Sequence, residues 1–203
     1  MSTSTSEPPY HHGDLHPALI EAALAILSEA GFAGLSLRAV AGRAGVSPMA
    51  PYRHFADKAA LLAAVAALGF RRLATRLEAA LAGVSPRQGL AAQGIAYVRF
   101  ACAEPALFRL MFGPEIIDKP GHPELAEAGE QAHAALRRAV AACVPGGQAA
   151  DVALAAWSLV HGLSMLAVDG RLGGAGTDID TLAGRITRLF GDGLAASGII
   201  RSA

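Results

Sequence analysis

The chain has 203 residues, of which 53% are hydrophobic and 17% charged, and its formal net charge at pH 7 is zero. This apolar content is enough for one large or two small hydrophobic cores and excludes a disordered chain. Aromatic residues make up only 5%, and alanine and leucine, which favour helices over strands, predominate. The composition therefore predicts an all-α protein.

Cysteine content and hydropathy indicate the cellular compartment in which the protein is found. The two cysteines, Cys102 and Cys143, are too few for a disulfide framework, so we expect buried free thiols. No apolar run free of charge and glycine reaches the roughly 20 residues that span a bilayer. We therefore expect a cytoplasmic protein without a membrane partner.

The first helix should follow a polar, flexible tail over residues 1–13. Asp14 is a good N-cap, and Gly31 can end the helix in a left-handed conformation. The apolar residues between them recur at helical spacing on one face: Leu15, Leu19, Ala22, Ala23, Ile26 and Leu27.

Three further helices are predicted before residue 82, each with a side chain that can cap its N-terminus. The caps and the helices that they begin are Ser36 with residues 37–44, Ser47 with 48 to about 55, and Asp57 with 58 to about 81. Later helices are expected over residues 87–103, 105–112, 124–144, 149–171 and 178–197. We divide the chain into a tail (1–13), a first domain (14–60) and a second domain (61–203).

Positive charge gathers in one stretch of this neutral chain. Asp57 is the single acid between residues 38 and 76, against seven bases: Arg38, Arg43, Arg53, Lys58, Arg71, Arg72 and Arg76. Helix surfaces without a partner usually mix acids with bases at i,i+4 spacing. The local excess therefore favours a nucleic-acid site.

Residues 37–55 have the pattern of a helix-turn-helix. Leu37, Val40 and Ala41 give the first short helix an apolar face, Gly45 allows a tight turn, and Val46 fills the core beneath it. A second short helix is expected to follow at once. In this arrangement the second helix lies in the major groove of DNA.

Ordered runs within residues 14–65 carry a resemblance to a known family. They are Leu35-Ser36-Leu37-Arg38-Ala39-Val40-Ala41, Ala44-Gly45-Val46-Ser47-Pro48, Tyr52-Arg53-His54-Phe55 and Asp57-Lys58 with Leu61-Leu62. This pattern resembles the DNA-binding domain of the tetracycline-repressor (TetR) family. The family implies a helix-turn-helix domain of three helices, joined by a long fourth helix to a helical domain for effector binding and dimerisation.

A narrower resemblance concerns a subset of that family with a C-terminal Trp-His-Gly signature. Pro51 stands where an aliphatic residue is more usual, and the subset shares the run 50–55 that contains it. The signature here is Trp157, His161 and Gly162, preceded by the matching stretch 105–113.

The resemblance assigns roles in DNA binding by position. Pro48, Met49 and Ala50 would face base edges, while the phosphate contacts would come from Ser36, Arg38, Ser47, Tyr52, Arg53, His54 and Lys58. Alternatives stay open for two of them, since Tyr52 can be a packing residue and His54 a solvated one. Lys58 at a helix N-terminus opposes the helix dipole, and this favours a use such as phosphate binding.

The large side chains of the second domain suggest a pocket. They are Tyr97, Phe100, Phe108, Met111, Phe112, Trp157, His161 and Met165. Trp157 and His161 lie one helical turn apart on one face. His161 either belongs to the core or lines an effector pocket, in which Tyr97 and Ser164 would be further polar groups.

The last two helices carry more apolar surface than a helix pair can bury, so a partner is expected. The residues are Leu154, Leu159, Leu163, Leu166, Leu182, Ile186, Leu189, Phe190 and Leu194. The family forms a four-helix bundle with a second subunit here, and a twofold dimer suits a palindromic operator. We expect Leu159, Leu163, Leu182, Ile186, Leu189 and Phe190 at the interface.

No residues suggest catalysis, a metal or a cofactor. Ser158 lies three residues before His161 without a nucleophile elbow, and the loop 173–176 has no lysine of a P-loop. His11 and His12 are adjacent, so their side chains diverge. We expect a transcriptional regulator, most simply a repressor released from its operator by a small apolar effector. The alternatives are an all-α small-molecule-binding protein without DNA binding and an all-α enzyme.

Overall fold

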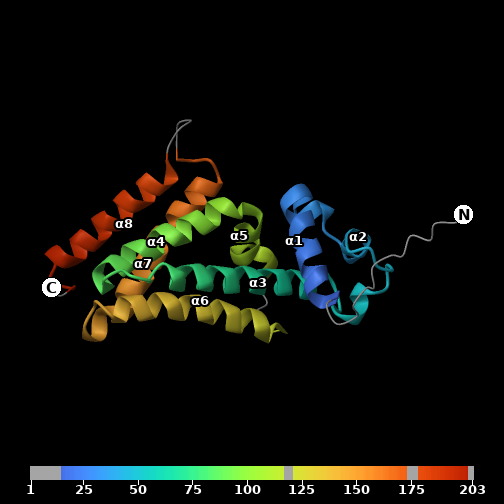
Figure 1. Cartoon of the computed structure of the whole chain (residues 1–203), viewed down its shortest axis with the longest axis horizontal. Helices are drawn as coiled ribbons and strands as arrows, with labels where there is room; N and C mark the ends of the chain where they lie inside the picture. The colour runs from blue at the N-terminus through green and yellow to red at the C-terminus, as the bar shows by residue number, and fades with distance from the viewer. Residues whose placement is uncertain (1–14, 117–120, 173–177, 201–203) are drawn as a thin grey trace, which may run out of the picture. The chain divides into compact units, whose positions relative to one another are not determined.

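The computed structural model describes residues 15–116, 121–172 and 178–200, which form helices and turns without a strand (Figure 1). The all-α prediction is confirmed. The α-helices are α1 (Leu15–Gly34), α2 (Leu37–Arg43), α3 (Lys58–Ala79), α4 (Pro86–Ala103), α5 (Pro105–Phe112), α6 (Pro123–Ala141), α7 (Ala149–Val168) and α8 (Ile179–Ala196). Short 3-10 helices are η1 (Pro51–Arg53), η2 (Pro114–Ile116) and η4 (Gly146–Gln148). The expected tail, His11, His12 and the loop 173–176 lie outside the described residues.

The chain forms two compact units, with the boundary between Leu61 and Leu62. Helix α3 begins in the first unit and continues into the second. Its N-terminus is capped as predicted, because Asp57 Oδ1 accepts a hydrogen bond from Ala60 N at 2.8 Å.

In the first unit, α1 buries the face that contains Leu19, Ala23 and Leu27. Gly31 has a φ of +63°, which glycine adopts without a steric penalty, and this residue breaks the regular helix at the predicted place. Ser36 then caps α2, with its hydroxyl accepting from Ala39 N at 3.1 Å. Helices α1 and α2 pack against each other.

The predicted third helix, from Pro48 to about Phe55, is wrong in length. Only η1 forms there, preceded by a turn. Pro51 has no N–H to bond to the Ser47 carbonyl, and that carbonyl accepts from Ala50 N at 2.9 Å instead. The His54 amide likewise bonds three residues back, to Pro51 O. Proline thus replaces an α-helix by tighter 3-10 turns.

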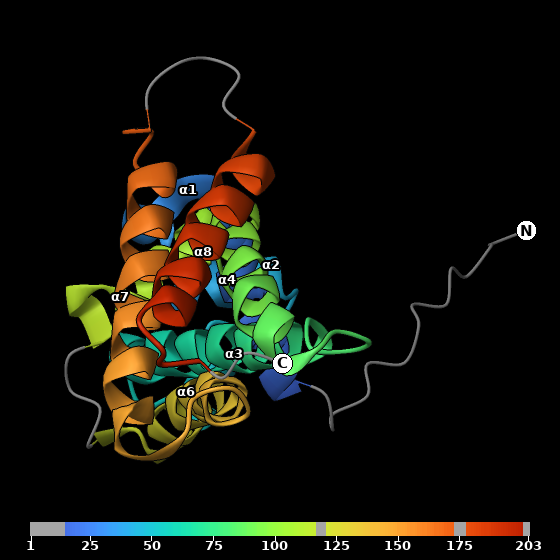
Figure 2. The same ribbon diagram turned by 90° about the vertical axis from the view of Figure 1, so that its left-hand side faces the viewer.

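The second unit is built around α4, which packs against α5, α6, α7 and α8. Helices α7 and α8 lie side by side, and α3 and α6 form a second pair (Figure 2). Helix α4 approaches α8 closely at Gly94, where a Cβ atom would lie 2.6 Å from Thr187 Cγ2 and 3.2 Å from Val160 Cγ1. Residue 94 must therefore lack a side chain.

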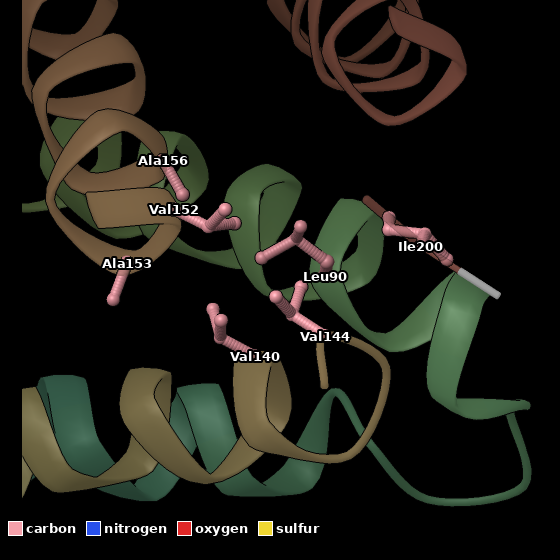
Figure 3. Packing of buried hydrophobic residues seen from close by; sticks show 7 residues of the cluster. All are labelled: Leu90, Val140, Val144, Val152, Ala153, Ala156 and Ile200. Carbon is pink, nitrogen blue, oxygen red and sulfur yellow. The ribbon is translucent and has the colours of Figure 1, made fainter. Parts of the chain in front are cut away.

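Part of the core of this unit lies where α4, α6 and α7 meet the C-terminal segment. The side chains point toward one another from these elements (Figure 3). The cluster consists of Leu90, Val140, Val144, Val152, Ala153, Ala156 and Ile200. Phe190 and Leu194 of α8 pack against it.

Two described helices, residues 15–34 and 146–168, are long and apolar enough to cross a membrane by length and composition alone. This is a weak indication, because core helices of soluble proteins meet the same criterion.

We expect Gly94→Ala to lower the free energy of unfolding by about 1–3 kcal/mol, because the added methyl group forces α4 away from α8 and α7. Gly129→Ala in α6 is the matched control. A Cβ there meets nothing within 4 Å, so alanine should raise stability by about 0.5–1 kcal/mol. Urea denaturation of both variants measures the difference, and equal effects would contradict the close-approach argument.

Candidate functional site

The first unit presents the predicted DNA-contact residues on its surface. Ala50 is half-buried, and the others are exposed: Ser36, Arg38, Ser47, Pro48, Met49, Tyr52, Arg53, His54 and Lys58. Met49 is 68% exposed and Tyr52 51% exposed, although both side chains are large and mainly apolar. Pro51 and Phe55, which alternate with them, are buried. The turns around η1 thus direct one set of side chains inward and the other toward solvent.

His16 of α1 supports this surface from the side. Its ring stacks on Phe55 at 4.9 Å between centroids and lies 5.8 Å from the ring of His54. Sequence reasoning missed His16, since its place on α1 gives no signal that it meets residues some forty positions later.

Lys58 has an internal partner. Its Nζ donates to the carbonyl oxygen of Phe32 at 3.2 Å, just after the break of α1 at Gly31. A cation is favourable near the C-terminal end of a helix, where carbonyls lack partners. This bond offsets the unfavourable place of Lys58 at the start of α3.

Several bases of the positive stretch are held in ion pairs. Arg43 binds Glu29 through both terminal nitrogens, at 2.5 and 2.6 Å, and this pairing lowers the pKa of the Glu29 carboxyl. In the second unit, Arg72 and Arg76 share Glu104, at 3.1 and 2.8 Å. The excess charge of the sequence is therefore partly neutralised locally. Arg38 and Arg53 of the first unit have no ion-pair partner among the described residues.

The second unit contains an apolar pocket. Its lining comes from α3, α4, α5, α6, α7 and α8: Phe70, Leu73, Leu77, Leu90, Gln93, Gly94, Tyr97, Phe112, Ala132, His133, Leu136, Ala156, Trp157, Leu159, Val160, Thr187 and Phe190. These lining residues include no aspartate, glutamate, lysine or arginine. The pocket volume of about 40 Å³ is larger than the roughly 10–15 Å³ that one water molecule requires.

Three polar side chains form a chain of hydrogen bonds beside the pocket. Trp157 Nε1 donates to the Tyr97 oxygen at 3.4 Å, and the Tyr97 hydroxyl lies 2.9 Å from His161 Nδ1. The indole N–H can only donate, so the Tyr97 oxygen accepts from it, and the Tyr97 hydroxyl can donate to Nδ1 when that nitrogen is unprotonated. Burial lowers the pKa of His161 and raises that of Tyr97 well above its usual value of 10.

Gln93 is the most buried polar residue of the lining, at 2% exposure. Its Nε2 donates to Leu77 O and to Ala135 O, both at 3.2 Å, and so ties α4 to α3 and α6. Its Oε1 is buried and has no partner. Sequence reasoning missed this residue, although its position one turn before Tyr97 on α4 was a usable signal.

The predicted pocket residues fall into two groups. Tyr97, Phe112 and Trp157 line the pocket. The others do not: Phe100, Phe108 and Met111 are fully buried, His161 is half-buried against the Phe112 ring at 4.6 Å, and Met165 is half-buried. Ser164 is completely buried, with no partner for its hydroxyl.

The residues predicted for a dimer interface also differ in exposure. Leu189 is 72% exposed, Leu163 is buried, and Leu182 and Ile186 are half-buried. Leu159 and Phe190 line the pocket. Leu154 and Leu166 of α7 are also exposed.

The cysteines and the possible metal ligands add no further site. Cys102 and Cys143 are free and half-buried rather than buried, and burial raises the pKa of both thiols. Among the described residues no cluster of histidine, cysteine, aspartate or glutamate could hold a metal ion.

Comparison with protein families agrees with both units. The family described as "Bacterial regulatory proteins, tetR family" matches residues 19–65, and "Tetracyclin repressor-like, C-terminal domain" matches residues 90–190. This chain belongs to the TetR family. Its N-terminal TetR domain makes it a DNA-binding transcriptional regulator, and this relationship suggests a function other than catalysis. The comparison does not extend to the Trp-His-Gly subset.

Solved structures show the same fold. A Rhodococcus sp. RHA1 protein of unknown function is 38% identical, with a TM-score of 0.78, and the match covers 93% of this chain and 100% of that one. A TetR-family regulatory protein from Rhodococcus RHA1 is 20% identical (TM-score 0.62; 87% and 95% covered). FadR from Bacillus subtilis, solved with stearoyl-CoA, is 14% identical (TM-score 0.69; 88% and 98% covered). No curated protein matches the chain.

The depressed pKa of His161 predicts an acid-sensitive stability. The unfolded chain binds a proton at His161 near the ordinary pKa of 6.5, whereas the folded chain binds it only at lower pH, so stability falls as pH decreases below about 6.5. Between pH 7.5 and 5.5, urea denaturation should show a larger loss for the wild type than for His161→Asn, whose amide oxygen can still accept from Tyr97. Equal losses would show that His161 titrates normally in the folded protein.

Proposed function

We propose that this regulator is a repressor whose homodimer binds a palindromic operator and leaves it when a small, largely apolar effector occupies the pocket of the second unit. The exposure of the predicted DNA contacts, above all of Met49 and Tyr52, is the observation that carries the proposal. Met49 and Tyr52 lie three residues apart in the turns around η1, and exposed apolar side chains that group together mark interaction sites. A DNA-binding regulator acts where the DNA is, so we also propose a cytoplasmic location.

Base recognition would rest on apolar contact and DNA shape. Pro48, Met49 and Ala50 have no side-chain groups for bidentate hydrogen bonds. Met49 can pack against thymine methyl groups in the major groove. Tyr52, Arg53, His54 and Lys58 would hold phosphates, with Ser36, Arg38 and Ser47 at the ends of the helices.

The effector would lie against the aromatic and aliphatic walls of the pocket. FadR, a structural neighbour, binds stearoyl-CoA, and its likeness here is one of fold. In this chain the lining has no lysine or arginine that could hold a phosphate group. This absence favours a neutral ligand. We also propose that the C-terminal half belongs to the Trp-His-Gly subset, and that Trp157, which lines the pocket, contacts the ligand.

The homodimer would form through α7 and α8. Their exposed leucines are Leu154, Leu166 and Leu189. A twofold interface contains these leucines from both subunits. The same symmetry would let the two DNA-binding domains bind the two halves of a palindrome.

DNA binding can be tested with three substitutions. Tyr52→Phe and Lys58→Ala should weaken binding to operator and to random duplex by similar factors, because phosphates carry no sequence information. Met49→Ala should instead lower the ratio of operator affinity to random affinity. Fluorescence anisotropy at several salt concentrations measures both, with a log–log slope of roughly −0.9 per neutralised phosphate. Salt-independent binding, or none, would favour the ligand-binding alternative.

Dimerisation can be tested at Leu189. Leu189→Asp should give monomers in analytical ultracentrifugation and abolish operator binding, because one half-site alone is too weak. Val84→Asp is the matched control, since Val84 is an exposed apolar residue outside α7 and α8. Phe190 is less suitable, because it lines the pocket and packs on the core. A wild type that is monomeric at micromolar concentration would overturn the dimer.

A further inference from the structure

We infer that Gln93 selects the ligand of the pocket, and that this ligand is a neutral molecule with a hydroxyl or N–H group that donates to Gln93 Oε1. The inference rests on the proposed function for the existence of an effector, and it adds the chemical class of that effector.

The orientation of the Gln93 amide is fixed by chemistry. Leu77 O and Ala135 O are both acceptors, and both lie 3.2 Å from Nε2. If the amide were turned over, three oxygens would face one another without a proton between them, so the NH₂ group must point to the two carbonyls. Oε1 is therefore held on the side of the amide that does not face these two carbonyls.

The two carbonyls are well suited to hold this amide. Leu77 lies in the last turn of α3, where the Leu81 amide bonds to Glu78 O. Terminal carbonyls of a helix need partners from outside it. Ala135 is inside α6, and its carbonyl has a second lone pair for Gln93. The same two bonds keep Gln93 on the pocket wall.

Oε1, the acceptor of this fixed amide, is buried without a hydrogen-bond donor. Among buried side-chain oxygens and nitrogens of the described residues, only Gln93 Oε1 and Ser164 Oγ lack a partner, and of these two residues only Gln93 lines the pocket. The other polar groups of the wall are occupied, since Thr187 Oγ1 donates to Ala183 O at 2.8 Å and the Tyr97 hydroxyl is bonded to His161. A buried acceptor without a donor is unfavourable, and a ligand donor relieves this.

The remaining lining defines the rest of the ligand. Trp157, Tyr97 and Phe112 offer aromatic faces, and the leucines offer aliphatic contact. The lining has no aspartate, glutamate, lysine or arginine, and its one histidine, His133, packs its ring against Trp157 at 4.8 Å between centroids. A carboxylate would bring its oxygens against Oε1. The pocket therefore favours a neutral apolar body with one donor over an acid or a phosphate ester.

Four probes of one size separate these classes in the full-length wild type: 4-ethylphenol and 4-ethylaniline, which donate, 4-ethyltoluene, which cannot, and 4-ethylbenzoate, an anion at pH 7.5. Trp157 is the only tryptophan and lines the pocket, so its fluorescence reports binding, and calorimetry checks it. Both donors should bind about tenfold more tightly than 4-ethyltoluene, and 4-ethylbenzoate should bind most weakly. Equal affinities, or no binding of either donor, would overturn the inference without need of a variant.

Substitutions then assign the preference to Gln93. Gln93→Leu should reduce the ratio of 4-ethylphenol to 4-ethyltoluene affinity to within about twofold, with circular dichroism to confirm folding. Ser164→Ala is the control, because Ser164 is equally buried with an unpartnered hydroxyl but does not line the pocket, and it should keep the wild-type ratio. A preference that survives in folded Gln93→Leu would assign it elsewhere.

A parallel operator-binding assay separates the two hypotheses. If the donors bind selectively but the protein never binds DNA, the proposed function fails and this inference stands. If ligands release DNA but show no preference for a donor, this inference fails and the proposed function stands.

Discussion

The arrangement of the second unit depends on how closely α4 can approach α8. At Gly94 there is room for a hydrogen atom and none for a methyl group, because Thr187 and Val160 occupy the space. Since α4 also packs on α5, α6 and α7, its position on α8 fixes where these helices stand. Gln93, the preceding residue, then has its amide within reach of α3 and α6. Gly94 and Gln93, which are adjacent in the sequence, thus lie where the helices of the second unit meet.

The aromatic residues of the second unit contact one another in one connected group and do not simply surround a cavity. Phe112 meets Phe70, Phe108 and His161, with centroids 4.6–5.3 Å apart. Edge-to-face contacts of this kind add to the free energy of area burial. Phe112 is therefore both part of the core and part of the pocket wall, while Phe108 behind it belongs to the core alone. Loss of packing in this group would alter the pocket even without any change in its polar groups.

Capping residues and apolar periodicity were sufficient to predict most helices, because Ser36, Asp57 and Gly31 act through local geometry. The segment 48–55 could not be predicted as it is, since the pattern shows which side chains are apolar but not that Pro51 diverts the hydrogen bonds to 3-10 turns. The pocket was harder still. Phe100 and Tyr97 look alike in a sequence, and only the packing of several helices buries one completely and leaves the other on a cavity wall. The hydrogen-bond partners that fix Gln93 lie 16 and 42 residues away, so the sequence could place this residue beside Tyr97 but could not show its bonds.

The bond from Lys58 to the Phe32 carbonyl has a consequence for the entropy of binding. A free lysine side chain has roughly 2 kcal/mol of rotamer entropy, which it loses when it is held in one place. Lys58 has already lost part of this freedom on folding, because one of its three N–H groups is fixed on Phe32 O. The Lys58 side chain remains exposed, and its other two N–H groups make no hydrogen bond to a described residue. An anion that meets this ammonium group therefore finds it preorganised, as long as the turn after Gly31 is intact.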